Sequence, residues 1–150
     1  MPVAIRNQQR LHKVATARLK KLAQRALDLL DASDDNLSLV IVNDTSIREL
    51  NREFHATDTP TDVLSFDYGD GELEVIVNIK RAFAVAEQYR NTASQELALY
   101  VIHGILHLHG FDDLTPAKRR KMRAAERRLL KSLAAECLSL QINRKASRPS

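Results

Sequence analysis

The sequence predicts a single α+β domain in which a small mixed β-sheet packs against about five helices. Two observations lead to this fold class. Short runs rich in Val, Ile and Leu alternate with longer segments whose apolar residues are three and four apart, which is the alternation of strands and amphipathic helices. The chain has 150 residues and is 44% hydrophobic, and one domain of that size buries on the order of 70% of its unfolded surface. We expect one domain over residues 1–138 and a disordered basic tail over residues 139–150.

In the first part of the chain, β-type runs are separated by helical patterns and by one acidic turn at residues 34–36. Apolar residues recur at helical spacing after residue 9, and the run 37–42 is almost entirely β-branched or Leu. Ser46 with Glu49 has the pattern of a capping box. The expected elements are a strand over 2–6, a helix over about 9–31, a strand over 37–42 and a short helix from Asp44 or Ser46 to about Phe54.

The second part begins with a loop over residues 55–61 that contains Pro60. Two β-type runs then flank Gly69-Asp70-Gly71, a local signal for a hairpin. Thr92 with Gln95 can cap the helix that follows residue 92, and Pro116 suits the first turn of the last helix. The expected elements are strands over 63–68 and 72–79, a helix over 80–89, a helix that starts after Thr92, and a final helix from 115 or 116 to 135.

The segment from His103 to Asp113 has the pattern of a metal site. His103 and His107 are four residues apart, so on a helix both imidazoles project from one face, with Cβ atoms about 5–6 Å apart. Gly110 permits the left-handed backbone that ends many helices, and the chain can then return a carboxylate to the same ion. Asp112 and Asp113 are both candidates, of which Asp113 is better placed. We therefore predict a metal site of His103, His107 and Asp113 on a central helix, as in metalloproteases.

A plainer interpretation is that these are core histidines, because the helix around them is apolar nearly all round. The helix-breaking glycine and the carboxylate behind it favour the metal site. His109 lies about 200° around the helix from His107 and is expected to pack elsewhere. Glu96 and Tyr100 share the stripe of His103 and are candidates for orienting its imidazole, although surface charge or pairing with the helix dipole explains Glu96 as well.

The histidine spacing also resembles that of metzincin proteases, which carry a Glu directly after the first His. Gly104 occupies that position here. Because this Glu is the general base of peptide hydrolysis, its absence removes that mechanism and leaves the metal-holding spacing intact. The pattern indicates a hydrolytic site without metzincin proteolysis.

A second motif, TPTDVLSF at residues 59–66, precedes the histidine helix, and LNREF at residues 50–54 leads into it. Together with HGILHLHGFDD, these segments resemble the YbeY family of bacterial rRNA maturation factors, over about residues 37–133. The resemblance implies an α+β fold around a helix-borne zinc site. It also implies a single-strand-specific, metal-dependent endoribonuclease that acts in late 16S rRNA 3′ end maturation and in small-subunit and whole-ribosome quality control.

Three positions depart from the pattern of that family. Asp113 stands where the family has a third histidine ligand; a carboxylate can still bind Zn²⁺, and as a harder ligand it also suits Mn²⁺ or Fe²⁺. His55 stands where the family usually has an Arg, which makes His55 a candidate phosphate contact with weaker or pH-dependent affinity. Leu73-Glu74-Val75 matches the family's Gly-Asp-Ile and loses the glycine.

Charge and composition are consistent with an RNA-directed protein of the cytoplasm. The net charge is +4 and the sequence has one cysteine, Cys137, so it forms no internal disulfide. The amino end lacks an apolar signal region and no run reaches the roughly 18 apolar residues of a membrane span, so we expect neither secretion nor membrane association. Eight basic residues crowd the last helix with Glu126 as their only acidic neighbour, either as a solvated face or as an RNA-binding surface. They are Lys118, Arg119, Arg120, Lys121, Arg123, Arg127, Arg128 and Lys131.

If the resemblance holds, His103, His107 and Asp113 provide a metal-activated water for RNA cleavage. Asp62 and Ser65 are candidates to line the cleft or, equally, to cap turns and register strands. The resemblance implies rRNA and the small ribosomal subunit as partners, with a small-subunit ribosomal protein and an Era-type GTPase as candidate protein partners. Two alternatives stay open: a non-catalytic RNA-binding factor of ribosome assembly, and a metal-dependent hydrolase, including a peptidase, of another substrate.

Overall fold

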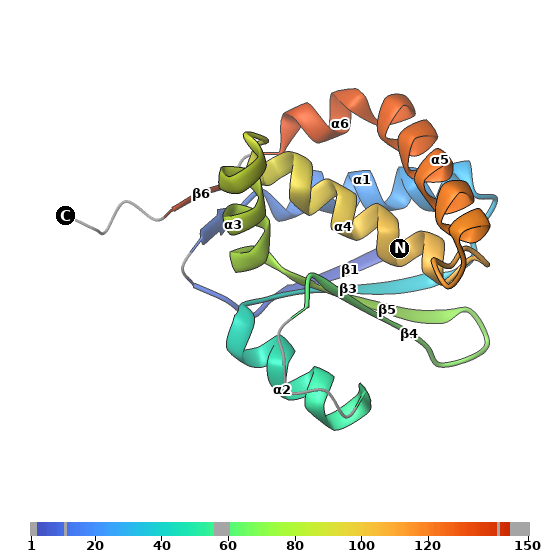
Figure 1. Cartoon of the computed structure of the whole chain (residues 1–150), viewed down its shortest axis with the longest axis horizontal. Coiled ribbons are helices and arrows are strands. Elements are labelled where there is room, and N and C mark those ends of the chain that lie inside the picture. Colours follow the sequence, from blue (N-terminus) through green and yellow to red (C-terminus); the bar gives the residue numbers. More distant parts are fainter. Residues whose placement is uncertain (1–2, 11, 56–60, 141, 145–150) are drawn as a thin grey trace.

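A mixed sheet of four strands forms the centre of the fold in the computed structural model, which describes residues 3–10, 12–55, 61–140 and 142–144 (Figure 1). The order across the sheet is β1-β3-β5-β4. The first three strands run parallel and β4 runs antiparallel to β5, so the sheet is mixed as predicted. The strands are β1 (Val3–Asn7), β3 (Asn36–Val42), β4 (Val63–Asp67) and β5 (Glu72–Asn78).

The helices are divided unequally between the two faces of the sheet, with one helix below it and the others above it in Figure 1. In the part of the chain that the structure describes, the lower face carries one helix, α2 (Asp44–His55). Among the described helices, none is both long and apolar enough to cross a membrane. The upper face carries α1 (Thr16–Leu29), α3 (Ile79–Tyr89), α4 (Ala93–His107), α5 (Pro116–Ser132) and α6 (Ala134–Ser139).

The main core lies between the sheet and the upper helices, and α4 runs through its middle. Its buried residues occupy most of the helix circumference, because α4 contacts α1, α3, α5, α6 and the strands β4 and β5. Val75 and Val77 of β5 face this core, whereas Ile76 faces the smaller cluster under α2 with Ile47 and Leu64. This alternation is the two-residue period of a strand buried on both faces.

Gly104 lets α4 approach the sheet more closely than any other residue would allow. A Cβ at this position would lie 2.7 Å from Val75 Cγ1 and 3.1 Å from both Ser65 Oγ and Val63 Cγ2. The Ser65 hydroxyl also donates a hydrogen bond to the Gly104 carbonyl at 3.2 Å. The glycine that replaces the metzincin Glu is therefore a packing residue that brings α4 against β4 and β5.

The amino-terminal helix begins later than the sequence predicts. The segment His12–Val14 forms a short strand, β2, and the helix starts only at Thr16. The buried Gln9 side chain donates to His12 O at 2.8 Å and accepts from His12 N at 2.9 Å, so the backbone of His12 is not available for a helix. The strand that pairs with β2 is β6 (Ile142–Arg144), which is far away in the sequence. No local sequence pattern reveals that pairing.

The carboxyl-terminal region also differs from its expected form. The final helix is divided at Leu133 into α5 and α6, since this fully buried residue leaves helical geometry with φ −105° and ψ 19°. The break turns α6 onto α1 and α4, a tertiary preference that overrides the high helix propensity of this segment. Residues 142–144 of the expected tail form β6 and residues 145–150 lie outside the described part, so the domain boundary at residue 138 stays a prediction.

Most local sequence signals agree with the structure. The 69–71 turn joins β4 and β5 as a hairpin, with positive φ at Gly69, Asp70 and Gly71. The helix α2 begins at Asp44, but its cap is Asn43, whose side chain accepts a hydrogen bond from Ser46 N at 3.2 Å. The α+β prediction is confirmed.

We predict that Gly104→Ala destabilises the fold despite its better helix propensity. Forcing a methyl group against Val75 costs about 1–3 kcal/mol, against a propensity gain of about 1 kcal/mol, so the free energy of unfolding in urea should fall by about 1 kcal/mol. Val75→Ala is the matched partner, because it removes the atom that the new Cβ meets. In that background Gly104→Ala should become neutral or stabilising; a gain in stability in the parent itself would contradict the close approach.

Candidate metal centre

The helix α4 presents His103 and His107 side by side. Its first turn is fixed by the predicted capping box, in which Thr92 Oγ1 accepts from Gln95 N at 3.1 Å and Gln95 Oε1 accepts from Thr92 N at 2.9 Å. The two imidazole centroids are 4.7 Å apart, with the rings inclined at 73°. Both side chains are half-buried, so they can meet an ion without being sealed from solvent.

The turn after α4 brings Asp113 back toward these histidines. Gly110 has φ +94°, the left-handed conformation that the sequence predicts. Phe111 N–H donates to Leu106 O at 3.1 Å across the turn. Ligand atoms of His103, His107 and Asp113 all lie within 4.8 Å of one another. The structure thus brings the three predicted residues together, with Asp113 as the exposed member.

The two neighbouring aspartates have separate tasks. Asp112 Oδ1 accepts a hydrogen bond from Leu114 N at 3.0 Å, and its other oxygen lies 3.5 Å from Lys118 Nζ. Asp112 therefore stabilises the turn, and Asp113 is left to face the histidines. The guanidinium of Arg119 donates to the Asp113 carbonyl at 3.2 Å, which ties this loop to α5.

The donor set fits a divalent metal ion. Two imidazole nitrogens and one carboxylate oxygen, with a further position open, are the ligands of catalytic zinc sites. The same mixture of nitrogen and oxygen donors also suits Mn²⁺ and Fe²⁺. The carboxylate of Asp113 is exposed and stands on a loop, whereas the two imidazoles come from a packed helix.

Glu126 supplies the contact that orients one imidazole. Its Oε2 accepts a hydrogen bond from His103 Nδ1 at 2.5 Å, across the interface between α4 and α5. This contact leaves His103 Nε2 as the nitrogen that would bind an ion, as in the carboxylate–histidine–metal arrangements of metalloproteins. The hydrogen bond to the Glu126 carboxylate raises the pKa of His103 against the opposing effect of burial, and the charges of Glu126, Asp62 and Asp113 add to the increase.

Glu126 was not predicted as a site residue. Glu96 and Tyr100 were the candidates for this role, because they share the stripe of His103 on its own helix. Instead Glu96 accepts a hydrogen bond from Asn91 Nδ2 at 3.2 Å. The signal that could have revealed Glu126 is its position as the one acid within a strongly basic helix.

A cleft of about 420 Å³ opens beside the three residues. Its other wall is the edge strand β4, which contributes Ser65, together with Asp62 just before the strand; both residues belong to the second motif. Ser65 lines the cleft, and its hydroxyl donates a hydrogen bond to the Gly104 carbonyl, which joins β4 to α4 and is neither strand registration nor turn capping. The residues that line the cleft are Thr61, Asp62, Val63, Leu64, Ser65, His103, His107, Leu108 and Asp113.

Two other predicted residues lie apart from the cleft. His109 points away from it as expected, with Nε2 2.7 Å from Asp35 Oδ2 and Nδ1 2.7 Å from Ile105 O. Glu74 binds Arg6 at 3.2 Å and accepts from the Tyr68 hydroxyl at 2.7 Å. Because Val75 faces α4, Glu74 belongs to the opposite face of the sheet.

The predicted phosphate contacts are only partly described. His55 is the last residue of α2, and its side chain lies outside the described part of the structure, so its role stays a prediction. The eight basic residues of α5 are all exposed. They cover the outer side of the helix whose inner side carries Glu126 and the buried Met122, Ala125 and Leu129.

The architecture defines a class: a small α+β protein with an open His-His-Asp site, suited to a metal ion, on the helix that packs against the sheet. A sequence model of the family described as Endoribonuclease YbeY matches residues 4–134. The chain belongs to this Endoribonuclease YbeY family.

Relatives of this name are similar over most of the chain. The Endoribonuclease YbeY of Geobacter metallireducens is 38% identical, over 92% of this chain and 99% of the relative. That of Geobacter sulfurreducens is 36% identical, over 86% and 93%. That of Bacillus pumilus is 34% identical, over 75% and 81%. The family predicted from the two motifs is therefore confirmed.

The fold has a counterpart among solved structures. A solution structure of a Thermotoga maritima protein superposes with a TM-score of 0.61 and 24% identity, covering 98% of this chain and 99% of the other. At this level of identity the likeness concerns the fold alone. It agrees with the α+β arrangement of sheet and helices described above.

We predict that Glu126→Gln weakens metal binding without unfolding the chain. Loss of the carboxylate leaves the His103 ring less firmly oriented and less basic, which typically costs about 10–100-fold in metal affinity. Competition titration against a chromogenic chelator measures this affinity. Glu87→Gln, which removes an exposed acid from α3, is the matched control and should bind metal like the parent. Equal affinities for both variants would show that Glu126 does not serve the site.

Proposed function

We propose that this chain is a metal-dependent endoribonuclease that cleaves single-stranded RNA at the cleft beside His103, His107 and Asp113. The observation that carries the proposal is the convergence of these three donors, together with the hydrogen bond that Glu126 accepts from His103 Nδ1. Membership of the Endoribonuclease YbeY family supports RNA as the substrate. Eight exposed basic residues on the adjoining helix α5 support attraction of a phosphate backbone.

Each residue of the site has a definable task in this chemistry. A bound divalent ion would supply Lewis-acid activation of water and of the phosphoryl oxygens. Glu126 holds the proton on His103 Nδ1 and so fixes the tautomer that presents Nε2. Arg119 restrains the loop of Asp113 through its backbone carbonyl. No carboxylate follows His103 as a general base, because Gly104 occupies that position, and we expect slow cleavage unless a partner assists.

The proposal extends to substrate and place of action. The natural substrate would be the 3′ end of 16S rRNA in late maturation, together with defective small subunits or whole ribosomes in quality control. The partners would be the small ribosomal subunit, one of its proteins and an Era-type GTPase. The protein would act in the cytoplasm and would not bind a membrane. Zinc would be the resident ion, with Mn²⁺ or Fe²⁺ as alternatives given the carboxylate of Asp113. The family resemblance supports these points.

Gly104 distinguishes this proposal from peptide hydrolysis. A metzincin-type Glu at position 104 would displace Val75 or the two β4 side chains beside it. The sequence therefore lacks the general base of peptide hydrolysis, and the packing of α4 against the sheet leaves no room for it. The remaining alternative is an RNA-binding factor without catalysis. Metal content and RNA cleavage separate it from the enzyme.

We predict about one zinc or similar ion per chain in tag-free purified protein, measured by plasma mass spectrometry. His107→Ala should lose the ion, because it removes one of two imidazole ligands. Asp113→His, which introduces the residue usual in the family at this position, should retain it. A parent that is empty and also fails to take up added metal would exclude the metal-dependent mechanism and favour the binding factor.

We also predict that the parent cleaves single-stranded RNA and leaves duplex RNA of the same sequence intact, as seen by gel electrophoresis. His107→Ala and Asp113→Ala should reduce the rate by at least about 100-fold, and a chelator should do the same to the parent. Cleavage by these variants at the rate of the parent would refute the site. A casein assay with metal present tests the peptidase alternative, and we expect no hydrolysis.

A further inference from the structure

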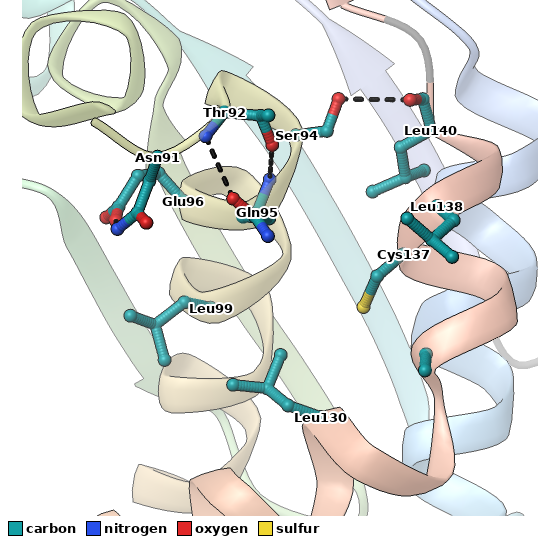
Figure 2. A pocket seen from close by; sticks show the side chains of 11 residues that line it. Asn91, Thr92, Ser94, Gln95, Glu96, Leu99, Leu130, Cys137, Leu138 and Leu140 are labelled. Atoms are coloured by element: carbon teal, nitrogen blue, oxygen red, sulfur yellow. Dashed lines mark hydrogen bonds between the residues drawn. The ribbon is translucent and has the colours of Figure 1, made fainter. Parts of the chain in front are cut away.

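A second hollow, of about 590 Å³, lies between the start of α4 and the segment where α5 meets α6 (Figure 2). Its walls are mainly aliphatic and its polar groups gather at the amino end of α4. A volume of this size is typical of a small-ligand site. The residues that matter most for the argument are Gln95, Glu96, Leu99, Leu130, Cys137 and Leu138.

Several hydrogen bonds hold this hollow in shape. The Ser94 hydroxyl donates to Leu140 O at 3.0 Å and so joins the start of α4 to the end of α6 (Figure 2). The Thr92–Gln95 capping box fixes the rim. The buried Glu96 carboxylate accepts from Asn91 Nδ2 at 3.2 Å. A ligand would therefore meet a surface that is already formed.

The hollow and the metal centre are both formed in part by α4, with no lining residue in common. Leu99 precedes His103 by four residues, and Leu130 follows Glu126 by four residues on the opposing helix. Since His103 and Glu126 are bonded to each other, the two leucines lie beside one another one helical turn away, which is about 6 Å along the axis. The wall of the hollow is therefore one helical turn along α4 from His103.

Two exposed cations of α5 are close in sequence to Leu130, which lines the hollow. Arg127 and Lys131 are exposed on α5 and stand next in sequence to Glu126 and Leu130, respectively. An RNA backbone that passes from the metal centre toward the hollow would meet these cations, which attract phosphates. An apolar hollow beside such a path suits the flat face of a base better than it suits a charged group.

We propose that this hollow binds one unstacked nucleobase of the single-stranded RNA substrate, adjacent to the phosphate that is cleaved. The inference rests on the proposed function. Aliphatic walls formed by Leu99, Leu130 and Leu138 enclose the base, and the polar rim with Glu96 and Gln95 faces its edge. Single-stranded RNA is recognised through bases that are splayed out of the stack, and a duplex cannot provide such a base. The hollow therefore contributes to single-strand specificity.

Cys137, the one cysteine of the sequence, is a natural reporter because it lines the hollow and is half-buried. Burial raises the pKa of its thiol, so alkylation with iodoacetamide is followed at mildly alkaline pH. The full chain is used as purified, with a short single-stranded RNA that carries 2′-O-methyl riboses to retard cleavage. At RNA concentrations of about ten times the dissociation constant, alkylation should slow about tenfold. An RNA with abasic residues in place of its bases should leave the rate unchanged.

A variant provides an independent measurement. Leu138 is 82% exposed, so Leu138→Ser removes one wall without disturbing the core. Fluorescence anisotropy should show about fivefold weaker binding of the base-containing RNA and unchanged binding of the abasic RNA. Leu29→Ser is the matched control, since Leu29 is a 45% exposed leucine that lines a different hollow, and it should bind both RNAs like the parent.

The outcomes separate this inference from the function on which it rests. Equal protection by intact and abasic RNA, or equal binding by Leu138→Ser and the parent, would overturn the base site and leave cleavage unaffected. Protection of Cys137 that increases with protein concentration in the absence of RNA would also overturn it, because a second copy of the chain would then cover the hollow. Failure of the parent to cleave unmodified RNA with metal present would instead overturn the proposed function.

Discussion

The close contact between α4 and the sheet at Gly104 is the constraint on which the site depends. With no side chain at this position, the helix comes against Val63, Ser65 and Val75, and the Ser65 hydroxyl bonds to its backbone. A larger residue would push α4 outward and separate the histidines from the edge strand β4, which forms the other wall of the cleft. The position that a metzincin uses for catalysis is used here for packing, so the same histidine spacing is placed in a different environment.

The second constraint links the candidate metal centre to α5. His103 and Glu126 join α4 to α5, and both side chains are largely shielded from water. Such a pair is costly to break on one side, because the remaining partner loses its hydrogen bond in a partly desolvated place. The orientation of the metal ligand and the docking of α5 are therefore stabilised by one contact. Arg119 acts in the same direction, because it holds the Asp113 loop against the first turn of α5.

Local patterns predicted much of this arrangement and long-range contacts account for the rest. The capping box at Thr92, the left-handed Gly110 and the 69–71 hairpin each depend on a few neighbouring residues, and the trio of His103, His107 and Asp113 follows from helix geometry and one turn. Glu126, the β2–β6 pair and the break at Leu133 depend on segments far apart in the chain. No periodicity within one element carries that information, and the hollow beside Cys137 needs three helices to form it.

The geometry of α4 explains how one helix can serve both the cleft and the hollow. One stripe of α4 consists of residues spaced four apart, namely Gln95, Leu99, His103 and His107. Because an α-helix has 3.6 residues per turn, each step of four residues rotates the stripe by about 40° around the helix axis. The stripe consequently winds from the side of α6, where Gln95 and Leu99 line the hollow, to the side of β4, where His103 and His107 line the cleft. A ligand that contacts the whole stripe must cross the helix obliquely. A flexible single strand with separately placed bases can follow such a path, whereas a regular duplex keeps its bases stacked inside. In the proposed function, the same four-residue spacing that pairs the candidate metal ligands would also favour single-stranded RNA on this surface.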